Sequence, residues 1–168
     1  MDSSGAGFTL IELVVVIAII GLLAAVALPR LIDAQRDARV AKAHAIHGSI
    51  RSAVALARSR CELDLSRGEA GAPGSSCRSN PPRVEMDGSM IDIANRHPAA
   101  TASGVDAAAA LNLAADRLTV GGAGCPSGAR CYDVVGGNPP NCRVIYQAAT
   151  RVDGVVVAPV ISVTTSGC

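Results

Sequence analysis

Aromatic residues are scarce in this sequence of 168 residues, in which Phe8, Tyr132 and Tyr146 occur but no tryptophan. A hydrophobic core must therefore be built from Ala, Val, Ile and Leu, and binding of nucleic-acid bases by stacking on aromatic side chains is disfavoured. The formal net charge is only +1, so the chain has no basic surplus for a phosphate backbone. We predict no specific nucleic-acid site.

Closely spaced cysteine pairs are absent as well. A thiolate metal site needs pairs such as C-x-x-C, whereas the shortest spacing here runs from Cys125 to Cys131. Six cysteines in so short a chain favour disulfide bonds in an oxidising compartment over a cytosolic enzyme. With 49% hydrophobic and 17% charged residues, the chain can build one compact domain with an appendage and is not generally disordered.

Enzyme motifs are also missing: there is no G-x-S-x-G elbow, no Walker loop and no dinucleotide-binding glycine pattern after a strand. His44 and His47 lie three residues apart on an expected helix, but two histidines without a carboxylate in the same turn are weak evidence for a metal. His97 precedes Pro98 and is expected in a loop. We predict neither catalysis nor a cofactor.

Three carboxylates, Glu85, Asp87 and Asp92, cluster in a segment that alternates like a β-hairpin. They could be interpreted as an acid–base pair or as calcium ligands. Alternation on a hairpin instead favours solvent-facing side chains, and the Asp-x-Asp-x-Asp-Gly pattern of calcium loops is absent. The sequence therefore favours solvated carboxylates and leaves a calcium site open.

The most prominent feature of the sequence is an apolar run from Phe8 to Leu28. Its 21 residues would span about 31 Å as a helix, close to the thickness of the hydrocarbon core of a bilayer. A cleaved secretory signal would carry basic residues before the run and a small-x-small site after it, whereas Asp2 precedes this run and Pro29 follows it. We therefore predict a retained membrane anchor.

Glu12 is the one acidic residue within this run. A charged side chain inside a membrane helix costs about 3 kcal/mol, unless it stays solvated at the headgroup interface. The alternative is a pairing that depends on processing, because a cut between Gly7 and Phe8 would create a positive α-amine four residues from Glu12. That spacing places the amine and the carboxylate on one helix face, within one molecule or across two neighbours.

The segment GFTLIEL at residues 7–13, followed by the apolar run, resembles the prepilin signature of type IV pilins and type II secretion pseudopilins. The resemblance implies that a prepilin peptidase cuts after Gly7 and methylates the new terminus at Phe8. It also implies that Glu12 is the glutamate that guides assembly of the filament.

Gly21 and Pro29 fall where the family has the glycine and proline that bracket a helix segment able to unwind in the filament. More distant similarity, at residues 31–57 and 96–101 and at Gly104, points to the mannose-sensitive haemagglutinin branch of these pilins. We expect four parts: a leader at 1–7, a transmembrane and filament-core helix at 8–29, an amphipathic helix at 30–60, and a disulfide-linked head at 61–168.

The resemblance implies a structural pilus subunit with a role in adhesion, motility or DNA uptake. Its expected partners are identical or homologous pilin subunits, prepilin peptidase, the pilus assembly machinery and the bacterial inner membrane. The head would lie in the periplasm before assembly and outside the cell afterwards. One alternative is a pseudopilin, whose polymer stays in the periplasm. Another is a membrane-anchored ligand-binding protein that does not polymerise, which leaves the pattern around Gly7, Phe8 and Glu12 unexplained.

From Leu31 to about Arg60 the sequence predicts a continuing helix, because it lacks proline and its small and apolar residues recur at steps of three and four. This stripe comprises Leu31, Ala34, Ala38, Ala41, Ala45, Ile46, Ile50, Ala53, Val54 and Ala57. Basic residues outnumber acidic ones on the other faces. They form either a solvated surface or one that pairs with acidic loops of neighbouring subunits.

The remainder is expected to be a strand-rich head. Residues 83–93 alternate around Asp87-Gly88 and predict a hairpin, and residues 143–149 and 155–165 predict strands. Residues 104–117 are rich in alanine and predict a short helix with Ser103 near its cap. The fold class is therefore α+β, with a long N-terminal helix packed on a small antiparallel sheet.

Six cysteines allow fifteen complete pairings. We favour two local bonds and one long one that ties the last strand to its expected partner; these are Cys61–Cys77, Cys125–Cys131 and Cys142–Cys168. The longest loop would contribute about 3 kcal/mol in the chain-entropy account. In the family, a disulfide near the C-terminus also bounds a loop that is exposed on the filament.

Overall fold

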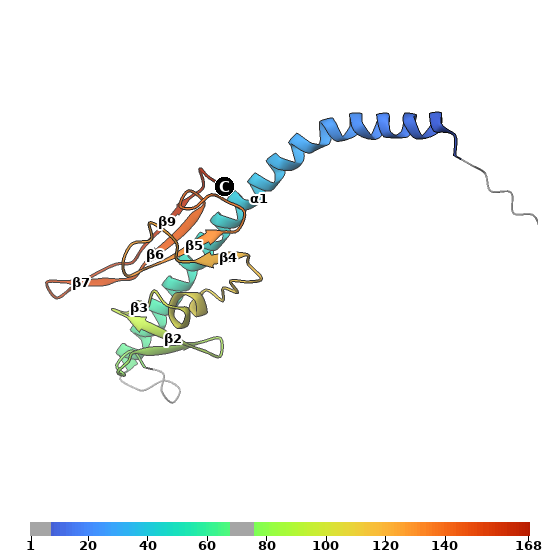
Figure 1. Ribbon diagram of the computed structural model, residues 1–168. Helices are drawn as coiled ribbons and strands as arrows, with labels where there is room; N and C mark the ends of the chain where they lie inside the picture. Colours follow the sequence, from blue (N-terminus) through green and yellow to red (C-terminus); the bar gives the residue numbers. More distant parts are fainter. Residues whose placement is uncertain (1–7, 68–75) are drawn as a thin grey trace, which may run out of the picture. The chain divides into compact units, whose positions relative to one another are not determined.

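The computed structural model describes residues 8–67 and 76–168, so the expected leader, including Gly7, lies outside the described residues. The elements are α1 Leu10–Arg67, β1 Arg83–Met86, β2 Ser89–Ala94, β3 His97–Pro98, η1 Ala102–Asp106, β4 Leu118–Val120, β5 Ala129–Val134, β6 Arg143–Gln147, β7 Thr150–Val152, β8 Val155–Val157 and β9 Val160–Thr164. The chain divides into two compact units, Met1–Ala38 and Arg39–Cys168, and α1 contributes to both (Figure 1).

In the second unit, one face of α1 is buried. The buried positions follow one another at steps of one, three or four residues, as expected for a single face of a helix: Ala43, Ile46, Ile50, Ala53, Val54, Ala57, Cys61 and Asp64. The helix ends at Arg67, so the expected end near Arg60 was too early. Ala41 and Ala45 were also assigned wrongly to this face and are exposed. Successive helical residues are rotated by about 100°, which turns Ala45 away from the side that Ile46 buries.

All strands of the second unit pair antiparallel, in three sheets with the orders β1-β2-β3, β4-β5-β6-β9 and β7-β8. The predicted hairpin is confirmed, since β1 and β2 pair around Asp87-Gly88. The last strand β9 pairs with β6, from Arg143 opposite Thr164 to Gln147 opposite Val160. With the helix and the disulfides, these sheets confirm the α+β class.

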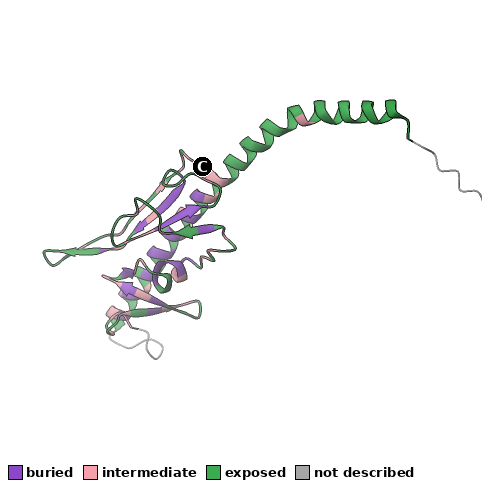
Figure 2. Ribbon diagram, viewed as in Figure 1, coloured by how far each residue is buried: buried purple, intermediate pink, exposed green. Residues whose placement is uncertain are grey.

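The core has two parts, both built on α1 (Figure 2). In the larger, Ile46 and Ile50 pack with side chains of the four-stranded sheet, among them Tyr132, Val144 and Tyr146. In the smaller, Ala57 and Cys61 pack with Val84, Ile91 and Ile93 of the β1–β2 hairpin. Aliphatic residues dominate both parts, as the scarcity of aromatic residues requires.

The helix expected at 104–117 is formed only in its first part and begins earlier than expected. The π-helix η1 covers Ala102–Asp106, helical residues continue to Ala108, and turns follow from Ala109 onward. Its N-cap is Thr101 and not Ser103. A side chain on Gly104 would lie 2.1 Å from the carbonyl oxygen of Ala99, so the backbone is pressed against the preceding segment there. Val105 N–H donates to the same carbonyl at 2.9 Å. Tertiary contacts therefore override the helix propensity of the alanines.

Two further expectations need correction. The single strand expected at 155–165 is divided at Ala158-Pro159 into β8, which pairs with β7, and β9, which pairs with β6. Proline has no N–H to donate to a ladder, which suits a change of partner at this point. His97 lies in the short strand β3 rather than in a loop and is 5% exposed.

The structure contains the three disulfide bonds that the sequence analysis favours: Cys61–Cys77, Cys125–Cys131 and Cys142–Cys168. The first joins the end part of α1 to the segment before β1. The second joins β5 to the loop before it. The third connects Cys142, just before β6, to Cys168, just after β9, and so closes the end of the β6–β9 pair.

Candidate assembly site

The start of α1 holds the residues that the prepilin resemblance singles out. Phe8 precedes the helix and is 72% exposed. Thr9 caps the helix, because its Oγ1 accepts a hydrogen bond from the Glu12 N–H at 3.3 Å and its carbonyl accepts one from the Leu13 N–H at 3.2 Å. This cap was not predicted, although the pattern T-x-x-E at Thr9–Glu12 is a sequence signature of a helix N-terminus.

Glu12 lies in the first turn of α1. A carboxylate at this position interacts favourably with the partial positive charge of a helix N-terminus. Phe8 and Glu12 are four residues apart, so an amine created at Phe8 would meet a carboxylate that the helix start already holds nearby. The positions that a cut after Gly7 would make chemically complementary thus lie four residues apart at the start of α1.

No residue of α1 between Leu10 and Ala38 is buried, and the large apolar side chains there stand free of other parts of their unit (Figure 2). An 18-residue window of the helix reaches a mean hydropathy of 3.0 and has none of its residues buried. By length and composition, this part of α1 could cross a membrane. Its exposed side chains include Leu10, Ile11, Ile17, Ile20, Leu22, Leu23, Val26, Leu28, Leu31 and Ile32.

Gly21 and Pro29 both lie inside the continuous helix α1. A side chain on Gly21 would meet no atom within 4 Å, so packing within the chain does not require glycine there. Glycine costs about 1 kcal/mol relative to alanine in a helix, and Pro29 removes the N–H that the carbonyl of Ala25 would accept from. Each of the two residues is unfavourable to a helix at its own position, although α1 is continuous through both.

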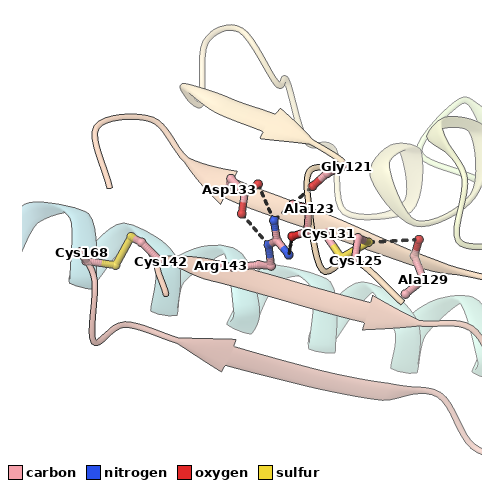
Figure 3. A network of polar contacts seen from close by, with 9 residues as sticks. All are labelled: Gly121, Ala123, Cys125, Ala129, Cys131, Asp133, Cys142, Arg143 and Cys168. Carbon is pink, nitrogen blue, oxygen red and sulfur yellow. Dashed lines mark hydrogen bonds and ion pairs between the residues drawn. A yellow bond between two sulfur atoms is a disulfide. The ribbon is translucent and has the colours of Figure 1, made fainter. Parts of the chain in front are cut away.

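The second unit contains a buried ion pair between neighbouring strands, which the sequence analysis missed (Figure 3). Arg143 Nε donates to Asp133 Oδ1 at 2.6 Å and Nη2 donates to Oδ2 at 2.9 Å. The same guanidinium donates to the carbonyl of Ala123 at 3.0 Å and contacts that of Gly121 at 3.4 Å. The hydrogen bonds to Asp133 raise the pKa of Arg143 against the effect of burial.

This ion pair explains why the second part of β5, from Cys131 to Val134, is buried on both faces. Tyr132 and Val134 face the core, whereas Asp133 lies under the loop that Arg143 and the Cys125–Cys131 disulfide hold in place. Gly122 permits this loop to approach Arg143 closely. It adopts φ +93°, and a side chain at this position would come within 2.8 Å of Arg143 Nη2. The charges at Asp133 and Arg143 were visible in the sequence, but their strand register was not.

A second buried network centres on Asp106. Its carboxylate accepts hydrogen bonds from Arg130 Nε at 2.7 Å and from the Tyr132 hydroxyl at 2.5 Å, and it also contacts Arg130 Nη2. The Tyr146 hydroxyl donates to the carbonyl of Pro98 at 2.6 Å. Burial raises the pKa of both tyrosines well above the ordinary value, and the bond to Asp106 raises that of Tyr132 further. These contacts fix η1 and β3 against the sheet.

The carboxylates of the first hairpin are spread out along it. Asp92 accepts from Arg83 Nε at 2.8 Å and from the Ser103 hydroxyl at 2.5 Å, and Asp87 is exposed in the turn. His44 is exposed and His47 is half-buried. Within residues 8–67 and 76–168, no three His, Cys, Asp or Glu side chains gather as metal ligands would.

Comparisons with known proteins agree with the N-terminal features. Residues 3–28 match the family model described as the prokaryotic N-terminal methylation motif. The chain is also similar to the type IV narrow pilus major component PilA5 of Thermus thermophilus, with 51% identity over 51 residues. That alignment covers 30% of this chain and 44% of the relative, so the chain spans less than half of the length of the relative.

No solved structure matches the chain significantly. The similarity to the mannose-sensitive haemagglutinin branch is not tested by these matches and stays a prediction. The methylation motif at residues 3–28 and the identity to a pilin of Thermus agree with the geometry at the start of α1. Together they show that the N-terminal part of this chain is similar to that of a type IV pilin.

Proposed function

We propose that the chain is a structural subunit of a type IV pilus. The observation that carries the proposal is the coincidence of the methylation motif with a helix whose apolar first part is entirely unburied. In water such a surface is unfavourable by about 25 cal/mol per Å² of apolar area. A membrane before assembly, and the helices of sister subunits afterwards, would each remove that surface from water.

In this proposal, prepilin peptidase cuts after Gly7 and methylates the amine of Phe8. The amine of one subunit then pairs with Glu12 of a neighbour, which offsets the cost of a carboxylate inside an apolar filament core. The four parts are a leader at 1–7, an anchor at 8–29, an amphipathic helix that extends to Arg67, and the disulfide-linked head. The segment between Gly21 and Pro29 would unwind as subunits pack. The subunit itself carries out no catalysis.

The membrane before assembly is the bacterial inner membrane, with the head in the periplasm, and the assembled pilus lies outside the cell. Adhesion, motility and DNA uptake are the roles that such a pilus would serve. The pseudopilin of a type II secretion system is the second candidate, because the N-terminal motif and the helix suit it equally. Disulfides form in the periplasm as well as outside the cell, so they suit both candidates. The segment closed by the Cys142–Cys168 bond, which in the family that the chain resembles is exposed on the filament, favours the pilus.

Intact mass spectrometry of protein sheared from the cell surface, without reductant, tests the proposal. We expect a species that begins at methylated Phe8 and is lighter by six hydrogens than its reduced form, from three disulfides. Processed protein found only in the membrane and periplasm would favour the pseudopilin. A chain that begins at Met1 in every fraction would contradict both filament functions and favour a membrane-anchored receptor.

A further inference from the structure

The β7–β8 hairpin projects as an arm from the second unit (Figure 1), and one of its faces carries exposed valines. The register pairs Val152 with Val155 and Thr150 with Val157, so these four side chains lie on one face of the arm. The three valines are 54%, 68% and 47% exposed in chain order. A two-stranded hairpin by itself is marginally stable in water, so this face lacks the packing that would hold it.

The tip of the arm is acidic. Asp153 and Gly154 form the turn with φ of 48° and 81°, and Asp153 is exposed. Among the residues that the structure describes, Asp153 makes no hydrogen bond or ion pair. The arm thus presents valines next to an unpaired carboxylate.

A groove of complementary character lies between α1 and the connection from β8 to β9. It has a volume of about 660 Å³, and its apolar lining includes Val54, Pro159 and Ile161. Arg51 and Arg58 stand at its side, and Arg58 also lines a smaller adjoining hollow of about 210 Å³. The volume lies within the range of about 300–1,000 Å³ that is usual for binding pockets.

The two arginines of the groove are unpaired within the described residues 8–67 and 76–168. Other arginines of the head have partners: Arg96 contacts Glu62 at 3.2 Å and Arg83 contacts Asp92 at 2.8 Å. Arg51 and Arg58 are seven residues apart, so they project from the same face of α1, about 10 Å from each other along its axis. They leave two positive charges beside an apolar floor.

We propose that the β7–β8 hairpin of one subunit docks in this groove of a second copy of the chain. The valines of the arm would cover the apolar floor, and Asp153 would pair with Arg58 at the point where the groove meets the adjoining hollow. This inference rests on the proposed pilus function and adds a contact between heads to the contacts between helices.

The symmetry of this contact agrees with a filament. The arm and the groove are different surfaces, so the interface is heterologous, and repeated heterologous contacts generate open helical polymers. A second copy is favoured over a small anion because the groove offers an apolar floor as well as positive charge. The chain itself carries a segment with both matching properties.

A charge exchange in the full-length chain tests the pairing. We expect Arg58→Glu and Asp153→Arg each to lower the yield of sheared filaments at least about tenfold, because each places like charges together. The double variant restores an opposite-charge pair and should recover to within about threefold of the natural chain. Asp87→Arg is the matched control, because Asp87-Gly88 is the corresponding exposed turn of the β1–β2 hairpin. It should leave the yield unchanged.

A second measurement locates the contact directly. In filaments that mix isotopically light and heavy subunits of the Arg58→Lys variant, a carbodiimide should join the new amine to Asp153 of another copy. Mixed-isotope peptide pairs would support the docking. Their absence, or a double variant no better than either single one, would overturn it. Failure of the natural chain to form any filament would refute the proposed function instead, which separates the two results.

Discussion

The two parts of α1 are continuous in the backbone but opposite in their surroundings. Between Leu10 and Ala38 no residue is buried, whereas from Ala43 onward one face packs against sheets and disulfides of the same unit. The first part has the greater hydropathy and the smaller number of partners within the chain. In a protein that stays in water, the more apolar part of the helix would instead be the part with more buried residues.

The comparison shows that the head finds its stabilising contacts inside the chain and the first part of the helix must find them elsewhere. The head is held by an aliphatic core, two buried ion-pair networks and three disulfides. The helix start offers only apolar area and one carboxylate. Changes in the first part should therefore alter assembly without altering the stability of the head, whereas changes in the buried networks of the head should alter its stability without altering the first part of the helix.

The largest effect on assembly is expected from Glu12→Ala. If the carboxylate pairs with the amine of a neighbour, its loss leaves that amine unpaired in the filament core, at a cost of about 3 kcal/mol or roughly a hundredfold in assembly. Counting sheared filaments by electron microscopy checks this. Cleavage and the urea midpoint of the head should stay as in the natural chain.

Asp33→Ala is the matched control, because Asp33 is an exposed carboxylate of α1 outside the apolar run. It should form filaments in normal number. Normal filaments from Glu12→Ala would remove Glu12 from the assembly mechanism and would leave apolar burial as the basis of the contact between helices.

The same contrast explains what could be predicted from the sequence. The features around Phe8 and Glu12 are local. They depend only on the spacing of residues along one helix, so they can be recognised from the sequence without the fold. The head depends on pairs that only the fold brings together, such as Asp133 with Arg143 and Arg130 with Asp106. Its hairpin at Asp87-Gly88 was predictable because the turn is also local.

Where local propensity and distant contacts disagree, the distant contacts prevail. The alanines after Gly104 predict a helix as far as Arg117, but the segment is held by the contact with Ala99 and by the hydrogen bonds that Asp106 accepts from Arg130 and Tyr132. Only the short helix η1 and the two residues after it are helical. Likewise, Pro159 was visible in the sequence, but the change of partner at that point depends on the position of β6. Neither outcome could be read from the period of the apolar residues.

The largest effect on the stability of the head, with none on the first part of α1, is expected from Arg143→Ala. The side chain of Arg143 is 1% exposed and that of Asp133 is 7% exposed, so the variant leaves a buried carboxylate without its partner. Breaking such a pair costs about 3–5 kcal/mol in the free energy of unfolding. Urea unfolding of the oxidised chain in detergent, followed by circular dichroism, measures it.

Arg83→Ala serves as the comparison, because its pair with Asp92 is at the surface, with side chains 45% and 27% exposed. Surface pairs contribute about 0–1 kcal/mol. Equal losses in the two variants would show that the loop over β5 does not shield Arg143 and Asp133 from water. Neither variant should change the exposure or membrane insertion of the first part of α1.

The smallest effect under ordinary conditions concerns Tyr132 and Tyr146, both fully buried in the head. Because the folded state raises their pKa values above the usual 10, the neutral phenols contribute no pH dependence below about pH 10. Above it the unfolded chain loses protons that the folded chain keeps. Stability should then fall with rising pH by up to about 1.4 kcal/mol per pH unit for each tyrosine, until the folded phenols ionise too.

The absence of tryptophan makes this measurable, because absorbance near 295 nm then reports the two tyrosinates alone. We expect no tyrosinate signal at pH 10–11 while circular dichroism shows a folded head, and then a joint change in both signals as the head unfolds. Asp106→Asn should permit ionisation of Tyr132 at lower pH, since it removes the carboxylate that opposes a second negative charge. If both phenols titrated near pH 10 while the head stayed folded, the two tyrosines would not be buried from water. The head would then be as accessible to solvent as the first part of the helix.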